Sequence, residues 1–142
     1  MRCACACCCW NTSCAARCCS KNWRIAAWSR SALSRLSACG VGVALDVYHI
    51  WWDPELMAQI ARAGRDRLLA FHVCDWLVPT KDILNDRGMM GDGVIDIKSV
   101  RAAVEAQGFA GYSEIEIFSN DWWGRPLDEV LQTCIERHRT VV

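Results

Sequence analysis

The chain has 142 residues and a formal net charge of zero. This length allows one domain with a real core and is too short for a complete large barrel. No stretch reaches the roughly eighteen apolar residues of a membrane span, and the start lacks the aliphatic core of a secretory signal. We therefore expect no membrane partner and a cytoplasmic location.

The zero charge hides an asymmetry between two parts of the chain. Residues 1–45 contain six Lys or Arg and no Asp or Glu, whereas residues 46–142 contain all sixteen acids and ten Lys or Arg. Cysteine is equally uneven, because nine of the eleven lie in residues 1–39. We interpret residues 1–40 as a low-complexity segment, rich in Cys, Arg and Ser, that lies outside the fold.

Residues 1–40 allow three interpretations. They fit a disordered segment, or a mis-framed start, because Arg, Ala, Cys, Ser and Trp without acids are typical of GC-rich DNA read in the wrong frame. Their Cys-x-Cys and Cys-Cys spacings also suit a thiolate metal cluster. The third interpretation would make the protein a non-enzymatic metal-binding fragment, and we favour the first two.

An orderly pattern begins with the apolar run at 41–47, which predicts a strand buried in a parallel sheet. Asp46 ends this run and His49 follows three residues later. The Asp-Pro pair at 53–54 predicts a helix that begins with an aspartate cap and ends at Gly64.

A second buried strand is predicted at 68–74, around His72. The loop that follows, 75–95, is unusually long for a compact domain, and loops of that length are usually functional. Its glycine-rich stretch at 88–93 lacks the spacing of a phosphate-binding loop, so we predict a flexible lid or a turn there.

Two further helices and a third strand complete the pattern. Asp96 caps a helix that ends at Gly108, a strand at 112–118 surrounds Glu116, and Pro126 begins the last helix. The apolar stripe predicted to be buried on that last helix comprises Leu127, Val130, Leu131, Cys134 and Ile135.

Strands that alternate with helices imply parallel strands, whose carboxyl ends meet at one edge of the sheet. Asp46, His72 and Glu116 then converge there. An oxygen and nitrogen set of this kind suits one divalent ion, Mn²⁺, Mg²⁺, Co²⁺ or Zn²⁺. Glu114 points the same way as Glu116 by strand alternation, so the pattern alone does not choose between them. Taken singly, the three residues also fit a capping acid, a core histidine and an arginine-paired acid.

Tryptophan is concentrated in the loops that follow these strands. Flat aromatic walls with a few polar groups suit the apolar face of a sugar or polyol, and they could equally seal the top of the sheet. The residues concerned are Trp51, Trp52, Trp76, Trp122 and Trp123.

Several short motifs, in this order and spacing, resemble the sugar phosphate isomerase/epimerase family, the xylose isomerase-like TIM barrels. The resemblance covers residues 41–142 and implies an α/β fold, a partial TIM (β/α)8 barrel of about three C-terminal βα units. The motifs are Leu-Asp-Val-Tyr-His at 45–49, Phe-His-Val-Cys-Asp-Trp at 71–76, Asn-Asp-Arg-Gly at 85–88, Gly-Asp-Gly-Val-Ile-Asp at 91–96, and Gly-Phe-Ala-Gly at 108–111 followed by Glu-Ile-Glu at 114–116.

The resemblance also implies roles for individual residues. Asp46 and His72 would bind the metal, and Glu116, which it favours over Glu114, would bind the metal and shuttle a proton. His49 and Arg87 would hold substrate oxygens. The family reaction is proton transfer next to a carbonyl through an enediolate. Together with the aromatic argument, this makes Trp51 and Trp76 the predicted substrate wall for a sugar or polyol.

The family's other glutamate belongs to an earlier strand, and residues 1–45 contain no acid. We therefore expect an incomplete fragment with weak or no isomerase activity, whose open barrel edges favour self-association. An inosose dehydratase-like lyase and an endonuclease IV-like enzyme are alternatives on the same fold. The second is disfavoured, and nucleic acid is not an expected partner, because residues 46–142 carry more acids than bases.

Overall fold

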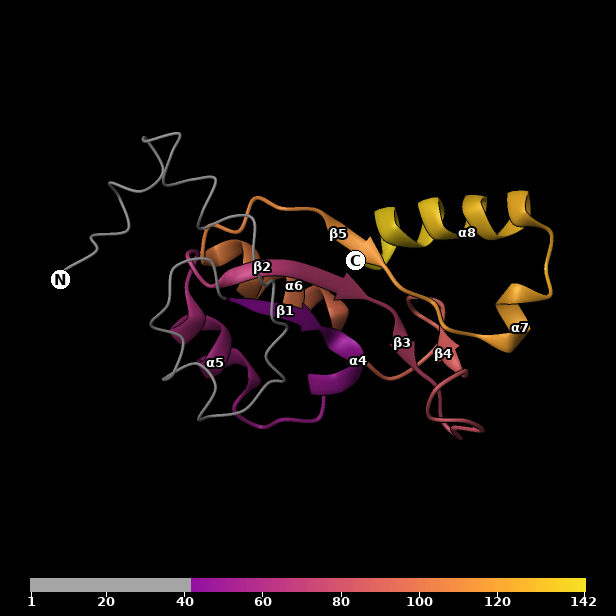
Figure 1. The fold of residues 1–142 in the computed structure, drawn as a ribbon, viewed down its shortest axis with the longest axis horizontal. Coiled ribbons are helices and arrows are strands. Elements are labelled where there is room, and N and C mark those ends of the chain that lie inside the picture. The colour runs from indigo at the N-terminus through magenta and orange to yellow at the C-terminus, as the bar shows by residue number, and fades with distance from the viewer. Residues whose placement is uncertain (1–41) are drawn as a thin grey trace, which may run out of the picture.

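The computed structural model describes residues 42–142. The predictions for residues 1–40, including the cysteine cluster, lie outside the described residues. Three parallel strands form the main sheet in the order β1-β2-β5, and a short antiparallel pair, β3-β4, extends from it (Figure 1). The strands are β1 (Val43–Asp46), β2 (Leu68–Val73), β3 (Asp75–Trp76), β4 (Arg87–Gly88) and β5 (Ser113–Ile115).

Helices follow the strands of the main sheet, which confirms the predicted α/β pattern with parallel strands. Among the described residues no helix is long and apolar enough to cross a membrane. The described helices are α4 (Val47–Ile50), α5 (Leu56–Ala63), α6 (Ile97–Ala106), α7 (Asn120–Trp123) and α8 (Leu127–Thr140).

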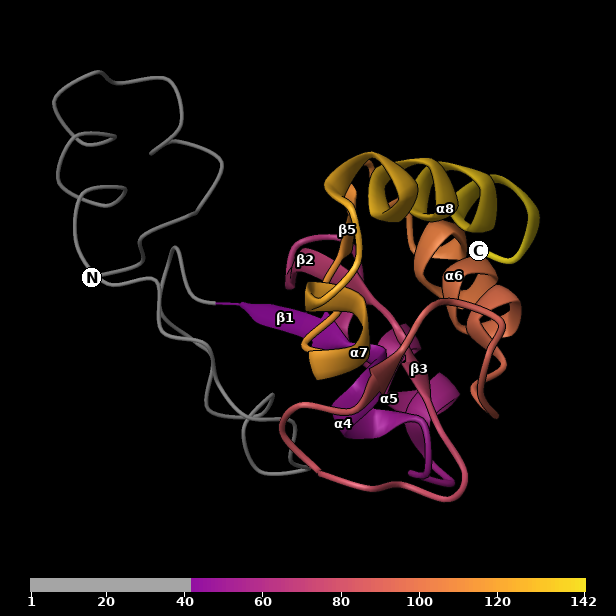
Figure 2. The ribbon, with the colours of Figure 1, turned by 90° about the vertical axis from the view of Figure 1, so that its right-hand side faces the viewer.

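The core lies between the sheet and the helices α5 and α6, which contact one another (Figures 1 and 2). Leu45 of β1, Val73 of β2 and Ile60 of α5 are completely buried, and Val104 of α6 is 1 % exposed. This continuous apolar packing holds β1 and β2 side by side, so that the carboxyl ends of both strands lie at the same edge of the sheet.

Helix starts follow the predicted capping chemistry with one change of position. Asp96 accepts hydrogen bonds from the backbone N–H and the hydroxyl of Ser99, as an N-cap should. Asp53 accepts from the N–H of Glu55, but Pro54 and Glu55 form a turn and α5 begins only at Leu56. The predicted aspartate therefore caps the turn before the helix.

Two predictions about burial are corrected by the structure. Of the two alternatives for segment 88–93, the turn holds and the flexible lid is wrong, because Met89 and Met90 are fully buried. The predicted burial of the α8 stripe is also wrong at Leu127, which is 79 % accessible, and at Leu131, which is 53 % accessible. The reason is positional: α8 follows β5, an edge strand of the described sheet, and within the stripe it is Cys134 that packs against the core.

Candidate metal and substrate site

Asp46 and His72 are placed together by strand register. They are Cα partners in the parallel pairing of β1 with β2, and both stand at or near the carboxyl end of their strand. Asp46 is also the N-cap of α4, and its Oδ1 accepts a hydrogen bond of 2.9 Å from the N–H of Tyr48. This bond fixes the carboxylate and leaves Oδ2 facing the site.

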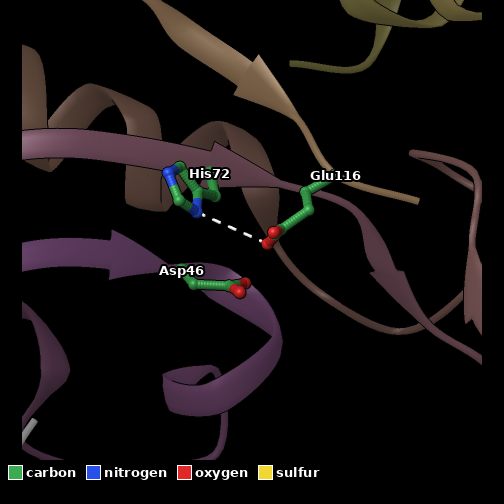
Figure 3. Close-up of side chains that lie close together, drawn as sticks. All are labelled: Asp46, His72 and Glu116. Atoms are coloured by element: carbon green, nitrogen blue, oxygen red, sulfur yellow. Dashed lines mark ion pairs between the residues drawn. The ribbon is translucent and has the colours of Figure 1, made fainter. Parts of the chain in front are cut away.

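Glu116 completes the cluster from the next strand along the sheet. It follows β5 directly, and its N–H is bonded to the carbonyl of Val73 at 3.1 Å, so it stays in line with β2 although the regular strand has ended. Its Oε2 lies 3.4 Å from His72 Nδ1, the contact drawn in Figure 3. Glu114 lies on the other side of the imidazole, 4.0 Å from Nε2, and is more exposed.

The three side chains fit one divalent ion. One ligand atom each from Asp46, His72 and Glu116 lies within 4.8 Å of the others, and Figure 3 shows the three side chains lying close together. Ligands about 2.1 Å from a common ion lie roughly 3–4.3 Å apart, so a movement of a few tenths of an ångström would close the site. Two carboxylates and an imidazole, all half-buried, suit a hard or borderline dication.

Arg87 occupies the centre of this cluster. Its Nη1 lies 3.0 Å from Asp46 Oδ2 and 3.1 Å from Glu116 Oε2, and its side chain is only 8 % exposed. Burial alone would lower the pKa of Arg87, but the charge of Asp46 and the surrounding acceptors outweigh burial and raise it. The guanidinium therefore stays protonated between the two acids.

His49 stands at the mouth of the cluster. Its Nε2 lies 3.3 Å from Arg87 Nη2 and 3.6 Å from Asp46 Oδ2, and its side chain is 65 % exposed. The structure thus brings the two predicted substrate ligands, His49 and Arg87, next to each other and next to the predicted metal ligands.

The predicted aromatic wall is partly built into the core. Trp76 lies between Tyr48 and Trp51, with ring centroids 4.6 and 5.8 Å away, and both tryptophans pack against buried residues. Trp51 Nε1 is buried without a hydrogen-bond partner among the described residues. Trp52 and Trp123 are exposed instead. Trp51 and Trp76 are therefore linked to the site through the ring contact of Trp76 with Tyr48, whose ring packs against the guanidinium of Arg87.

Sequence reasoning missed the residues that hold Arg87. Its guanidinium carbon lies 4.5 Å from the ring centre of Tyr48 and 5.1 Å from that of Phe118, and Nη1 is 3.8 Å from Cys74 Sγ. Burial raises the pKa of the Cys74 thiol to about 12, so the sulfur is neutral. Cys74 could have been found from its place two residues after His72, because alternate residues of a strand share a face.

A family model for the xylose isomerase-like TIM barrel matches residues 21–138. No curated protein matches the chain. Among solved structures, the crystal structure of protein SMc04130 from Sinorhizobium meliloti 1021 is similar with a TM-score of 0.70 and 66 % identity, over 72 % of this chain and 38 % of that chain.

A crystal structure of the IolI protein with a bound zinc atom is similar with a TM-score of 0.61 and 25 % identity, again over 72 % of this chain and 38 % of that one. The chain therefore spans well under half the length of both solved relatives. The family match covers most of the chain and agrees with the parallel strands, the βα order and the resemblance found in the motifs. The chain belongs to the xylose isomerase-like TIM-barrel family.

Proposed function

We propose that residues 42–142 carry the metal-binding half of a site that moves a proton next to the carbonyl of a sugar or sugar phosphate. The reaction class is that of an isomerase or epimerase. The observation that carries this proposal is the convergence of Asp46, His72 and Glu116, whose ligand atoms lie within 4.8 Å of one another at the carboxyl edge of a parallel sheet.

Asp46, His72 and Glu116 would hold one divalent ion. Zinc is supported by the zinc atom in the IolI structure, and Mn²⁺, Mg²⁺ and Co²⁺ suit the same ligand set. When bound, such an ion polarises a carbonyl oxygen and so acidifies the neighbouring C–H bond.

Glu116 is the proposed proton carrier. Its carboxylate is 34 % exposed, so it can reach a substrate, and His72 and Arg87 fix its Oε2 from two sides. In the proposed step it removes the proton from the carbon next to the carbonyl and later returns it. Glu114 is 58 % exposed and makes a longer contact with His72, which supports Glu116 over Glu114 for this role.

The other side chains orient the substrate in this proposal. His49, at the mouth of the cluster, and Arg87, whose Nη2 lies 3.3 Å from it, would bind substrate oxygens. Trp51 and Trp76 would offer ring faces to the apolar side of a sugar. These contacts would hold the carbon next to the carbonyl within reach of Glu116.

A complete epimerisation needs a second proton carrier on the opposite face of the substrate. The family resemblance implies that this glutamate belongs to an earlier strand, and the acids grouped at this edge of residues 42–142 are Asp46, Glu114 and Glu116. We therefore propose that this chain, acting alone, exchanges the substrate proton with solvent but gives weak or no net isomerisation.

Proton exchange can be separated from turnover in deuterated water. The 142-residue chain, loaded with Mn²⁺ or Zn²⁺ and then freed of excess ion, is incubated with ketohexoses and their phosphate esters, and the C–H signal is followed by NMR. We expect slow loss of the proton next to the carbonyl, and a decrease in rate of about a hundredfold or more for Glu116→Gln. Glu136→Gln, an exposed position on α8, is the matched control.

Three outcomes carry information. A chain that binds metal but shows no exchange, or exchange that survives Glu116→Gln, contradicts the proposal. Loss of a hydroxyl from the substrate after proton removal would instead favour a dehydratase-like lyase.

A further inference from the structure

One nitrogen atom bridges the two carboxylates of the proposed metal site. Arg87 Nη1 contacts Asp46 Oδ2 at 3.0 Å and Glu116 Oε2 at 3.1 Å. The other oxygen of Asp46 is already held by the backbone N–H of Tyr48. The oxygen atoms best placed for an ion are therefore the ones that the guanidinium occupies.

Arg87 cannot move far from this position. Its guanidinium lies between the rings of Tyr48 and Phe118, and its backbone N–H is bonded to the carbonyl of Phe118 at 2.9 Å. Strand β4 also pairs with β3, which fixes the backbone of Arg87 against Trp76. If its two hydrogen bonds to the acids were broken, the cation would still remain beside the site.

The charges at this edge decide how Arg87 affects an incoming ion. Without metal, the single positive charge of Arg87 offsets the repulsion between Asp46 and Glu116 and holds their oxygens close together. A dication that binds the same oxygens replaces those hydrogen bonds and meets a cation that cannot lose its proton. Like charges a few ångströms apart in a half-buried site repel strongly.

We infer that Arg87 competes with the metal for Asp46 and Glu116, so that this arginine sets the affinity of the site for divalent ions and is displaced toward His49 when an ion binds. This inference rests on the proposed metal site, and it adds a role that precedes any contact of Arg87 with substrate. His49 is the neighbour on the open side, 3.3 Å from Nη2.

The test is a titration of the full chain with Mn²⁺, which thiolates bind poorly, so that the cysteines of the N-terminal segment do not obscure the result. Free Mn²⁺ is counted by its electron paramagnetic resonance signal. Arg87→Met keeps the apolar stem and removes the charge, and Arg87→Lys keeps the charge. Arg137→Met is the matched control, because Arg137 pairs with Asp92 at a partly exposed position away from the cluster.

We expect Arg87→Met to lower the dissociation constant for Mn²⁺ by about tenfold or more, Arg87→Lys to change it less, and Arg137→Met to leave it unchanged. Equal constants for wild type and Arg87→Met overturn the inference and leave the metal site intact. If no folded variant binds Mn²⁺, the proposed metal site fails as well. Circular dichroism verifies that each variant is folded.

A measurement on the wild-type chain covers the case in which Arg87→Met does not fold. Titration with diamagnetic Mg²⁺ should shift the Nε–H resonance of Arg87, assigned by comparison with Arg87→Lys, as its partners change. An unchanged Arg87 signal while the signal of His72 shifts would show that the ion binds without displacing the arginine, and would overturn the inference.

Discussion

Asp46 and His72 are paired across β1 and β2 because the register shifts by one residue near the start of β1. Val43 pairs with Leu68 and Ala44 with Ala70, so one residue of β2 is skipped between them. Without this shift Asp46 would face Phe71 and the acid would be separated from the imidazole. A local irregularity at one end of the strand thus aligns the proposed ligands at the other end.

Gly42, just ahead of this shift, is predicted to tolerate no side chain. A Cβ there would lie 2.5 Å from the backbone oxygen of Arg67, which cannot give way cheaply. Gly42→Ala should lower the free energy of unfolding by about 1–3 kcal/mol and weaken metal binding, because the start of β1 must move. Gly124→Ala is the control, since the nearest atom there is 3.6 Å away. Urea unfolding measures the stability of the two variants. Equal stabilities would contradict the predicted clash at Gly42.

Asp75 is predicted to hold the long loop in place. It is 1 % exposed and accepts hydrogen bonds from the N–H groups of Trp76, Gly91 and Ile95, at 2.8 to 3.0 Å. Asp75→Asn turns one acceptor into a donor and should cost about 2–4 kcal/mol of unfolding free energy. Asp66→Asn, at an exposed position, serves as the control. A loss no larger than that of the control would show that the loop does not depend on this carboxylate.

His138 on α8 makes stability depend on pH in a predictable direction. Burial, together with the positive charge of Arg101, lowers its pKa below the ordinary value of 6.5. The unfolded chain therefore takes up this proton more readily than the folded one, and stability should fall as the pH drops below about 6.5. Thermal unfolding of His138→Gln should show a weaker fall between about pH 7 and pH 5. Identical profiles for the two proteins would argue against the assignment.

The exposed stripe of α8 should drive self-association. Leu127 and Leu131 are large apolar side chains that are largely exposed, and β5 is an edge strand of the described sheet. Replacing both leucines with Gln should reduce the growth of apparent mass with concentration, measured by light scattering. Ala102→Gln, on an exposed face of α6, should not. Association that is unaffected by the leucine changes would place the contact elsewhere.

The grouping of the three candidate ligands was largely predictable because it depends on order along the chain. Parallel strands end at one edge, so the sequence alone was enough to group Asp46, His72 and Glu116, and the Asp96 cap followed from its position. Whether Glu114 or Glu116 lies in the cluster depends on where strand β5 ends. β5 ends at Ile115, and the backbone that follows keeps the side chain of Glu116 in the cluster.

The remaining features depend on contacts between distant segments. Arg87 reaches Asp46 across 41 positions because the β3-β4 pair folds the long loop back over the sheet edge, and no local pattern encodes that return. The exposure of α8 was missed for a related reason. An amphipathic pattern predicts that a stripe needs a partner, but it does not say which element provides one.

The most direct test of the metal site is an anomalous difference map from crystals of the full chain grown with Mn²⁺ or Zn²⁺ and measured at the corresponding absorption edge. We predict one peak within about 2.3 Å of ligand atoms from Asp46, His72 and Glu116, and no peak there in His72→Ala crystals. A map in which the ion lies elsewhere, or in which this cluster holds only Arg87 at saturating metal, would contradict the proposed metal site.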